Sequence, residues 1–419
     1  MKVLIISHCQ LSVGYSIGKT LASLFAAFNK RELCQLYVHA GFPDIDICNS
    51  YYRLTDRDVM KGIFRFGAKG KEVAATENYA DNADKKSTKT LRAEKLKELL
   101  RDALWKVSPW FGKDLRAFIE REKPTCIFVA VGSGKFIYDV ALKISKVYNI
   151  PIITYVCDDY YFNGTDRSLT GKIWSRKLRK KSDKLFTSSK ALVSICREMS
   201  EIYQKTFHTP AYTVMTGSSI RKSKLFDKNE KVKNINYFGK LSLKRYESIL
   251  DIGRALDEIN LSGSEKFNLN VFCGGITEET RTLFKDVKSI RLHDFVRGED
   301  FEREFFASDI LLHVESFDPF IKERVKYSVS TKIADSLASG IPVFAYGPKG
   351  IASIDYLAEN AAAITATDKG ELKDMLKEAL YNAELRGKTV LNAKALAEKN
   401  HNAEAVSEKI RQIILSAER

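Results

Sequence analysis

Apolar runs and amphipathic patterns alternate along the first half of the chain. Short runs rich in Val, Ile, Leu and Phe have the length of buried strands, and the segments between them carry apolar residues at helical spacing. We expect strands at 2–7, 35–40, 125–132, 150–158, 184–189 and 211–217, and helices at 15–29, 135–149 and 190–207. Residues 50–122 are polar and highly charged, and predict a flexible segment followed by a helix. This order is typical of a parallel, doubly wound sheet.

The pattern restarts after a polar, basic segment at 218–234, which we interpret as a linker. We expect strands at 235–242, 267–275, 289–296, 309–316 and 341–348, and helices at 245–259, 278–286, 299–308 and 330–340. The sequence therefore predicts an α/β protein with two Rossmann-like domains that face each other across a cleft. We place them at 1–220 and 232–400, with a C-terminal helix at 401–419 that packs back toward the first domain. Such sheets bind ligands at the carboxyl ends of their strands.

Composition narrows the cellular setting. No run of 18 apolar residues appears, so we expect no membrane span. The seven cysteines are widely spaced and form no C-x-x-C pair, which favours a reducing cytoplasm and argues against structural zinc. Lys and Arg number 68 against 53 Asp and Glu, a formal net charge of +15. This excess favours an anionic partner.

The basic excess is concentrated at 172–184, which contains seven basic residues and one acid. One interpretation is a solvated helix face. The other is an interfacial helix on anionic lipid, with Trp174 and Leu178 on one side of the helix. We expect no nucleic-acid partner, because no recognition motif accompanies the charge.

The glycine turn after the first strand resembles a phosphate-binding loop but does not match one. The motif G-x-x-x-x-G-K-[ST] requires four residues between its glycines, and Gly14 and Gly18 are separated by three. The G-x-G-x-x-G dinucleotide signature is also absent.

A cluster of small and hydroxyl residues precedes the predicted helix at 330–340. Ser328, Ser330 and Thr331 can cap its start, where free N–H groups bind anions. Lys332 adds a positive charge in the first turn, and Asp335 is spaced to meet a ribose diol. An ordinary capped helix explains the pattern equally well.

Two cations follow the first strand of the second domain. The strand ends at Gly239, and Lys240 and Arg245 lie on the next loop and helix start. Cations at the carboxyl end of a strand suit a diphosphate. The alternative is that both are surface cations of a basic protein.

These motifs resemble a retaining GT-B glycosyltransferase of the family 4 type. Its "G-R-L-S-x-x-K-G" loop, which binds the donor diphosphate, is here "GKLSLKRY", with Lys240 at the arginine position and Arg245 at the lysine position. Its "E-G-F-G-x-x-x-x-E-A-M-A-S-G-x-P-V" segment is here "YSVSTKIADSLASGIPV". Asp335 replaces the glutamate that holds the ribose, and Tyr327 replaces the one that touches the donor sugar.

The resemblance is to a bacterial subgroup with the motif "S-T-K-I-x-D-x-L-A-S-G". In that subgroup an extra loop, here "FDPFIKERVK", follows the strand that carries Glu315, a further donor-site candidate. The family's glycine turn lies near the donor phosphates and the acceptor, a place that Gly14 fits. Asp158 and Asp159 come shortly after the apolar run "IPIITYV" of the strand expected at 150–158 and are candidates for acceptor binding. A loop turn with an aspartate cap, or a D-x-D-like metal site, remains an alternative for this pair.

The resemblance implies transfer of a hexose from a nucleoside-diphosphate sugar to a saccharide or lipid-linked acceptor, with retention. Lys240 and Arg245 are the catalytic candidates, since they would stabilise the leaving diphosphate without a metal or cofactor. It also implies cell-surface polysaccharide synthesis at the cytoplasmic face of a membrane. Two alternatives remain open. One is a nucleotide-sugar 2-epimerase, and the other is a non-catalytic GT-B-like partner subunit, to which Tyr327 points.

Overall fold

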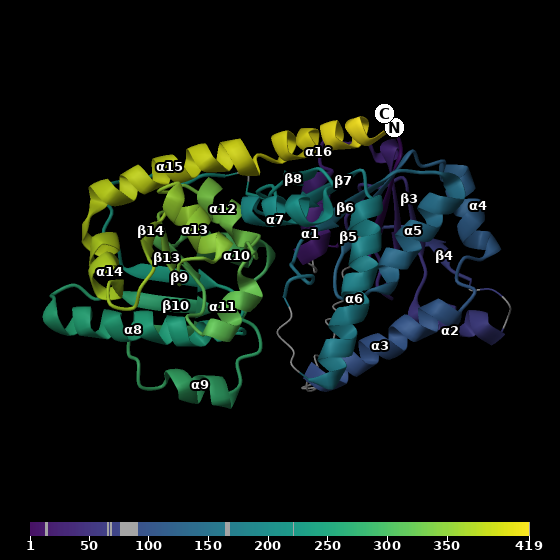
Figure 1. Ribbon diagram of the computed structural model, residues 1–419. Coiled ribbons are helices and arrows are strands. Elements are labelled where there is room, and N and C mark those ends of the chain that lie inside the picture. Colours follow the sequence, from purple (N-terminus) through teal and green to yellow (C-terminus); the bar gives the residue numbers. More distant parts are fainter. Residues whose placement is uncertain are drawn as a thin grey trace. The chain divides into compact units, whose positions relative to one another are not determined.

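The computed structural model describes residues 1–12, 16–64, 67, 69–75, 91–163, 168–220 and 222–418 (Figure 1), without the side chains of residues 16 and 91–95. The chain divides into two compact units. Unit 1 comprises Met1–Gly217 and Ala403–Arg419, and unit 2 comprises Ser218–Asn402. No described helix combines the length and the apolar character that a bilayer crossing needs.

Unit 1 is built on an eight-stranded sheet in the order β4-β3-β2-β1-β5-β6-β7-β8, parallel except for the antiparallel pair β3–β4. Its strands are β1 (Val3–Ser7), β2 (Leu33–Tyr37), β3 (Ser50–Arg53), β4 (Lys71–Val73), β5 (Cys126–Val131), β6 (Ile152–Val156), β7 (Ala191–Ser194) and β8 (Ala211–Thr213). Strands β1, β5 and β6 are buried along their whole length, as continuous apolar runs predict for a parallel sheet covered on both faces.

The helices of unit 1 follow from the spacing of their apolar residues. They are α1 (Ser16–Leu24), α2 (Asp56–Phe64), α3 (Leu91–Val107), α4 (Lys113–Glu122), α5 (Phe136–Tyr148), α6 (Leu169–Ser188), α7 (Arg197–Phe207) and α16 (Ala403–Glu418). In α5, Phe136, Val140 and Ile144 recur every four residues and are buried. The helix ends at Asn149, which adopts the left-handed conformation with φ 53°.

Unit 2 contains a six-stranded parallel sheet in the order β11-β10-β9-β12-β13-β14. Its strands are β9 (Asn234–Phe238), β10 (Asn268–Phe272), β11 (Ile290–His293), β12 (Ile310–Val314), β13 (Val343–Tyr346) and β14 (Ile364–Ala366). Strands β9, β10 and β11 add in one direction, and β12 returns to pair with β9 on its other side. This reversal of strand order makes the carboxyl ends of β9 and β12 the switch point of the sheet, where ligands bind in open α/β folds.

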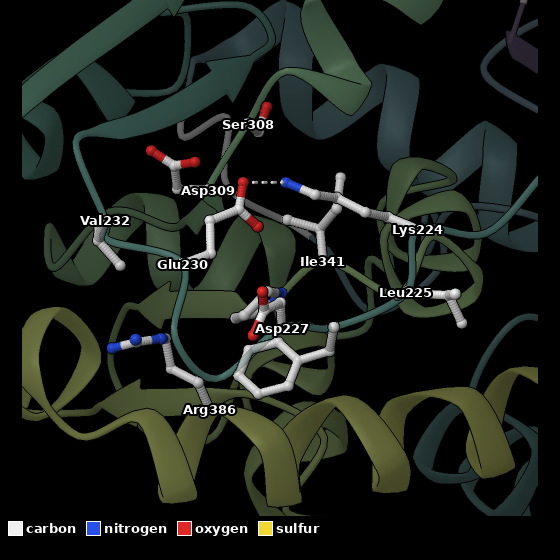
Figure 2. Close-up of a pocket in the computed structure, with 12 residues that line it drawn as sticks. Lys224, Leu225, Asp227, Glu230, Val232, Ser308, Asp309, Ile341 and Arg386 are labelled. Carbon is white, nitrogen blue, oxygen red and sulfur yellow. Dashed lines mark hydrogen bonds and ion pairs between the residues drawn. The ribbon is translucent and has the colours of Figure 1, made fainter.

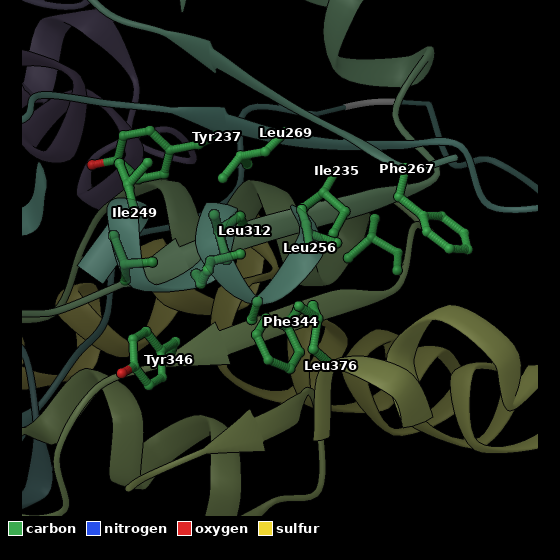
Figure 3. Packing of buried hydrophobic residues seen from close by; sticks show 14 of the residues in the cluster. Ile235, Tyr237, Ile249, Leu256, Phe267, Leu269, Leu312, Phe344, Tyr346 and Leu376 are labelled. Atoms are coloured by element: carbon green, nitrogen blue, oxygen red, sulfur yellow. The ribbon is translucent and has the colours of Figure 1, made fainter. Parts of the chain in front are cut away.

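Two hydrophobic clusters cover the two faces of this sheet. Figure 3 shows the first cluster, in which Ile235, Leu312 and Phe344 meet residues of the covering helices such as Leu256 and Leu376. Alternate residues of a strand face opposite sides, and Leu311, Val343 and Ala345 accordingly belong to the second cluster. The helices are α8 (Arg245–Ser262), α9 (Glu278–Phe284), α10 (Gly298–Phe306), α11 (Pro319–Val325), α12 (Lys332–Ala338), α13 (Ala352–Glu359), α14 (Leu372–Tyr381) and α15 (Ala383–His401).

The structure corrects several predicted elements. Residues 184–188 are the last turns of α6 and not a strand, because Leu185 and Phe186 continue its buried face. The predicted helix at 190–207 begins with the strand β7 and only then becomes α7. The polar region 50–122 contains the strands β3 and β4 and the helix α2 in addition to α3 and α4. The expected extra loop after Glu315 contains the helix α11.

The segment 218–234, interpreted as a linker, belongs to unit 2, and its described residues pack against the rest of that unit. Lys224 N donates to Ser339 O at 2.6 Å. Gly340, at φ 79°, lies so close to this segment that a Cβ there would stand 2.1 Å from Lys224 O. A side chain at position 340 would therefore displace the segment.

Helix α16 contacts α1, β5 and β6 of unit 1, and one of its arginines makes several of the polar contacts. Arg411 donates to both carboxylate oxygens of Glu32 at 2.9 and 3.0 Å and to Ala27 O at 3.1 Å. Its guanidinium also lies over the ring of Phe28, 4.2 Å from the centroid. A planar fork of this kind fixes both distance and orientation.

We expect Arg411→Met to loosen α16 and to lower the stability of unit 1 by about 1 kcal/mol, since the pair is only partly buried. The hydrogen bond to Arg411 lowers the pKa of Glu32 below its ordinary 4.5. The ion pair therefore contributes its full stabilisation above pH 4.5, and this stabilisation is lost as the pH falls through the lowered pKa of Glu32. Hydrogen exchange of the α16 backbone amides at pH 7 and pH 3 measures the loss of stability and its pH dependence. Arg303→Met, on the exposed surface of α10, is the control.

Candidate functional site

The switch point of unit 2 brings together residues from two separate motifs. Gly239 follows β9, and its N–H donates to Phe272 O at 3.0 Å. A Cβ at position 239 would lie 2.6 Å from the hydroxyl of Tyr237 and 3.1 Å from Nζ of Lys332. The Lys332 ammonium, which comes from α12, therefore reaches the carboxyl end of β9. Glycine at position 239 therefore lets the Lys332 ammonium approach the backbone closely, where a side chain would crowd it.

Arg245 and Glu315 form the central ion pair of this site. Nε of Arg245 donates to Oε2 of Glu315 at 3.2 Å, and Nη2 donates to Oε1 at 2.9 Å. The Glu315 side chain is 2% exposed and the Arg245 side chain 20%. The hydroxyl of Ser248 donates to the backbone oxygen of Glu315 at 2.7 Å. These contacts tie the start of α8 to the end of β12.

A histidine that is 13% exposed lies next to the pair. Nε2 of His313 is 3.1 Å from the hydroxyl of Ser353 and 3.9 Å from Oε1 of Glu315. Burial, followed by the positive charges of Arg245 and Lys332, lowers the pKa of His313 to about 3. His313 is therefore neutral at physiological pH, and both cations are close enough to influence it.

The loop between β9 and α8 is held in an uncommon conformation. Leu243 and Lys244 adopt φ values of 60° and 55°, in the left-handed region that residues with side chains rarely enter. Nζ of Lys244 binds Oδ2 of Asp318 at 2.6 Å, which holds the loop against the start of α11. Lys240 is exposed on this loop, and its carbonyl accepts from the hydroxyl of Tyr237 at 2.9 Å.

The segment before α12 differs in part from its predicted role. The hydroxyl of Ser330 accepts a hydrogen bond from Lys332 N at 3.4 Å. Thr331 occupies the N-cap position, but its side chain makes no capping bond within this described helix. Ser328 N donates to Val325 O at 2.8 Å, which joins the segment to α11. The prediction that all three residues cap the helix is therefore wrong for Thr331. Its backbone is helical, and an N-cap side chain needs an extended one.

Asp335 accepts hydrogen bonds from the first two residues of the 218–234 segment. Its Oδ1 accepts from the hydroxyl of Ser218 at 3.0 Å and from Ser219 N at 2.7 Å. The hydroxyl of Ser219 lies 3.2 Å from both carboxylate oxygens. The contact anchors the segment to α12. The predicted ribose contact stays a prediction, and would require Asp335 to share or exchange these donors.

Of the residues predicted in unit 1, Asp159 has a local structural role. It accepts from Tyr161 N and Phe162 N, each at 3.0 Å, and from the hydroxyl of Tyr203 at 2.9 Å. Burial raises its pKa, and these hydrogen bonds oppose that change. Asp158 is exposed beyond the end of β6. Gly14 lies outside the described residues. Within the described part of the chain, no three His, Cys, Asp or Glu side chains form a group that could hold a metal ion.

The prediction that Trp174 and Leu178 form a lipid-facing side of α6 is wrong. Trp174 is 3% exposed and Leu178 is fully buried, because the apolar side of the helix packs into unit 1. Lys181 likewise points inward and bridges Asp102 and Asp139 at 2.6 Å each. The exposed side carries a different set of residues, namely Leu169, Lys172, Ile173, Arg176, Lys177, Arg179 and Lys180.

Sequence reasoning missed His313 and also His8, which follows β1 at the switch point of unit 1. The ring of His8 contacts Arg101, and Arg101 forms an ion pair with Asp56 at 2.8 Å. Burial, then Arg101 and His39, lower the pKa of His8 to about 4. A single histidine is a weak signal by itself. Its position directly after the first strand of a predicted doubly wound sheet was the available clue.

A small cavity lies elsewhere in unit 2, lined by residues of the 218–234 segment and by Arg386 of α15 (Figure 2). It measures about 20 Å³, which is room for a water molecule. Lys224 and Glu230 form an ion pair of 3.0 Å across its rim, and Arg386 donates to Ala379 O and Leu380 O at 3.0 and 2.9 Å. These contacts join loops and helix ends, and the cavity is too small for a ligand much larger than water.

Comparisons with known proteins agree with this architecture. A family model described as glycosyl transferase-like matches residues 254–412. No curated protein matches the chain. The solved structure of Anabaena HepE in complex with UDP matches with a TM-score of 0.65 and 11% identity, covering 99% of this chain and 100% of that one.

Two further solved structures extend the comparison. Sucrose-phosphate synthase from Thermosynechococcus elongatus matches with a TM-score of 0.63 and 9% identity, over 99% of each chain. Trehalose 6-phosphate synthase from Burkholderia multivorans matches with a TM-score of 0.59 and 10% identity, over 99% of this chain and 97% of that one. These likenesses show that the chain has the GT-B fold, as the sequence predicted.

We expect the titration of His313 to report the cations of the site. Lys332→Met removes a charge that lowers the pKa of His313, so that pKa should rise above about 3 yet stay below the ordinary 6.5, because burial remains. Imidazole resonances followed by NMR between pH 3 and pH 7 measure this. Lys369→Met, at an exposed ion pair with Asp251, is the control and should leave His313 unchanged. An unchanged titration in Lys332→Met would place Lys332 away from the site.

Proposed function

We propose that the protein is a glycosyltransferase that uses a nucleoside-diphosphate sugar. One observation carries the proposal: Arg245 and Lys332, from two motifs 87 positions apart, lie at the same switch point. Positive charge around an accessible backbone at this edge suits a diphosphate. The solved HepE structures with UDP and with UDP-glucose add support, because a nucleotide-sugar is accommodated by the same fold there.

The chemistry that the site has to assist is departure of a nucleoside diphosphate from the anomeric carbon. Negative charge grows on the leaving phosphate in the transition state, and fixed cations stabilise it more than they stabilise the bound donor. We assign this catalytic role to Lys240 and Arg245, with Lys332 and the backbone around Gly239 holding the diphosphate. No metal is part of the proposed step. We further propose transfer of a hexose with retention, directed by the leaving phosphate, so that no enzyme carboxylate serves as nucleophile.

The other contacts are assigned by their place in the fold. Asp335 is proposed to hold the ribose, with Ser328 and Ser330 beside it, after its bonds to Ser219 rearrange. In unit 1, Asp158 is the stronger acceptor candidate, since it is exposed and Asp159 is committed to its own loop. A saccharide or lipid-linked acceptor, cell-surface polysaccharide synthesis and a cytoplasmic location complete the proposal.

A non-catalytic GT-B-like partner subunit is the second candidate. Tyr327 supports it, because tyrosine stands where the resembling family has a glutamate against the donor sugar. The 2-epimerase alternative is weaker, since the titratable groups that meet at this switch point, Glu315 and His313, are only 2% and 13% exposed. Turnover of a nucleotide-sugar donor separates a transferase from a partner subunit.

A thermal-shift panel of UDP, GDP, CDP and ADP tests donor binding. The matching nucleotide should raise the melting temperature by mass action, and Arg245→Ala and Lys240→Ala should reduce that rise. Loss of one cation from the transition state costs about 2–4 kcal/mol, so donor hydrolysis should fall about 30- to 1000-fold. Lys373→Ala, at an exposed ion pair with Glu258, should behave as wild type. Binding without any turnover would favour the partner subunit, and no binding at all would contradict both.

We also propose that unit 1 binds an anionic membrane surface through α6 and α3. The exposed side of α6 presents Leu169 and Ile173, 76% and 43% exposed, among the basic residues of 172–184. Helix α3 packs beside α6 and exposes a stripe of Leu96, Leu100 and Val107 at 50%, 64% and 70%. Apolar side chains framed by lysine and arginine are typical of surfaces that lie at a lipid interface.

Flotation with anionic liposomes should recover the wild-type protein at low salt, and 1 M salt should release it, because screening then acts over about 3 Å. The triple change Arg176→Glu, Lys177→Glu, Lys180→Glu should abolish flotation, since each basic residue contributes about 1 kcal/mol. Leu169→Ser should weaken it. Leu225→Ser removes an equally exposed leucine from unit 2 and should have no effect. Wild-type protein that remains in solution at low salt would contradict the membrane surface.

A further inference from the structure

Glu315 raises a question that the donor-binding role does not answer. A carboxylate repels a diphosphate, yet this one lies 2.9 Å from the arginine that is expected to bind it. Glu315 is 2% exposed and is fixed at the end of β12, where its N–H donates to Tyr346 O at 2.9 Å and its carbonyl accepts from Ser248. Such a carboxylate is part of the framework and has little surface to offer a ligand.

The geometry of the pair divides the guanidinium into two edges. Glu315 accepts from Nε and Nη2, which form one edge of the planar group. Nη1 has no hydrogen-bond partner in the described part of the chain, and the arginine side chain is 20% exposed while its partner is buried. One edge is therefore held from inside, and the other is left to face a ligand.

The backbone before Arg245 is in an uncommon conformation. Arg245 is the first residue of α8, directly after Leu243 and Lys244 in left-handed conformations. No side chain among the described residues caps α8 at Lys244. A long arginine side chain on such a helix end would sample several rotamers, and a bidentate partner limits it to one.

We propose that Glu315 is a positioning residue that holds Arg245 with its Nη1 edge toward the leaving diphosphate, and that it does not itself contact the donor. This inference rests on the proposed function. It assigns Glu315 a different task from the donor contact expected from the sequence. The negative charge of Glu315 holds the arginine in place. It does not itself add to the affinity for the donor.

The proposal predicts that the effect on rate exceeds the effect on binding. Glu315→Gln keeps the shape and one hydrogen-bond acceptor but loses the charge and the two-point grip. We expect kcat for hydrolysis of UDP-glucose to fall at least tenfold, while the donor KM changes less than threefold. Glu258→Gln is the matched control, because it makes the same carboxylate-to-amide change at an exposed ion pair with Lys373, which has no part in the proposed site. Its kcat should equal that of wild type.

A double-variant cycle distinguishes positioning from simple stabilisation. If Glu315 acts through Arg245, Glu315→Gln should reduce kcat no further once Arg245→Ala is present. The double variant leaves neither member of the pair as an unpaired buried charge, so it should fold even where Arg245→Ala alone is unstable. Independent, additive losses of kcat in a folded double variant would overturn the positioning role.

The pH dependence gives a further readout. Burial raises the pKa of Glu315, with Arg245 opposing, and the other titratable or charged groups around it are His313, Tyr237 and Lys332. As pH falls, protonation of Glu315 releases Arg245, so kcat should decline. Because the pKa of Glu315 is raised, the decline should begin at a higher pH than an ordinary glutamate would give. Glu315→Gln should flatten that decline. His313 does not titrate in this range, since its pKa is about 3.

Calorimetric titration with UDP separates the failure of this inference from failure of the proposed function. Tighter UDP binding by Glu315→Gln with unchanged kcat would overturn the inference, because Glu315 would then be a competing anion, yet it would support a diphosphate site. Loss of UDP binding in Arg245→Ala but wild-type kcat and KM in Glu315→Gln would do the same. Wild-type protein that binds neither UDP nor another nucleoside diphosphate would contradict the proposed function and the positioning role together.

Discussion

The reversal of strand order between β9 and β12 is the constraint on which the site depends. All strands of the unit 2 sheet are parallel, so their carboxyl ends share one edge. Ligands of open α/β sheets bind at such a reversal, beyond the carboxyl ends of the strands. The Arg245–Glu315 pair crosses this point and joins the start of α8 to the end of β12. Every other feature of the site is arranged around it.

The electrostatics of the site follow from burial as much as from charge. Arg245 and Lys332 bring two positive charges to a region where His313 is held neutral and Glu315 balances one of them. A site of this kind attracts an anion without the repulsion that bare clustered cations would produce. The nearby Lys244–Asp318 pair performs a mechanical task, since it holds a loop whose backbone is unfavourable by itself.

Alternating runs made the fold predictable. Buried strands such as β1 and β5 and amphipathic helices such as α5 follow directly from the spacing of apolar residues. Predictions failed where length alone decides between helix and strand. Residues 184–188 contain too few apolar positions to show that they extend α6, and Ala191–Ser194 is too short to be separated from the helix that follows it. Packing on neighbouring strands settles both.

The sequence by itself determined which residues are available for the chemistry. It identified Gly239, Lys240, Arg245 and Lys332 because glycine turns, hydroxyl residues and cations recur after strands in ways that suit phosphate. Tertiary structure decided what each residue does. Glu315 pairs with Arg245, Asp335 holds Ser219, and Trp174 points inward where amphipathic spacing left its direction open. The physical reason is that spacing fixes which residues share one face of an element, whereas the elements packed against that face decide whether it is buried and which partners it meets.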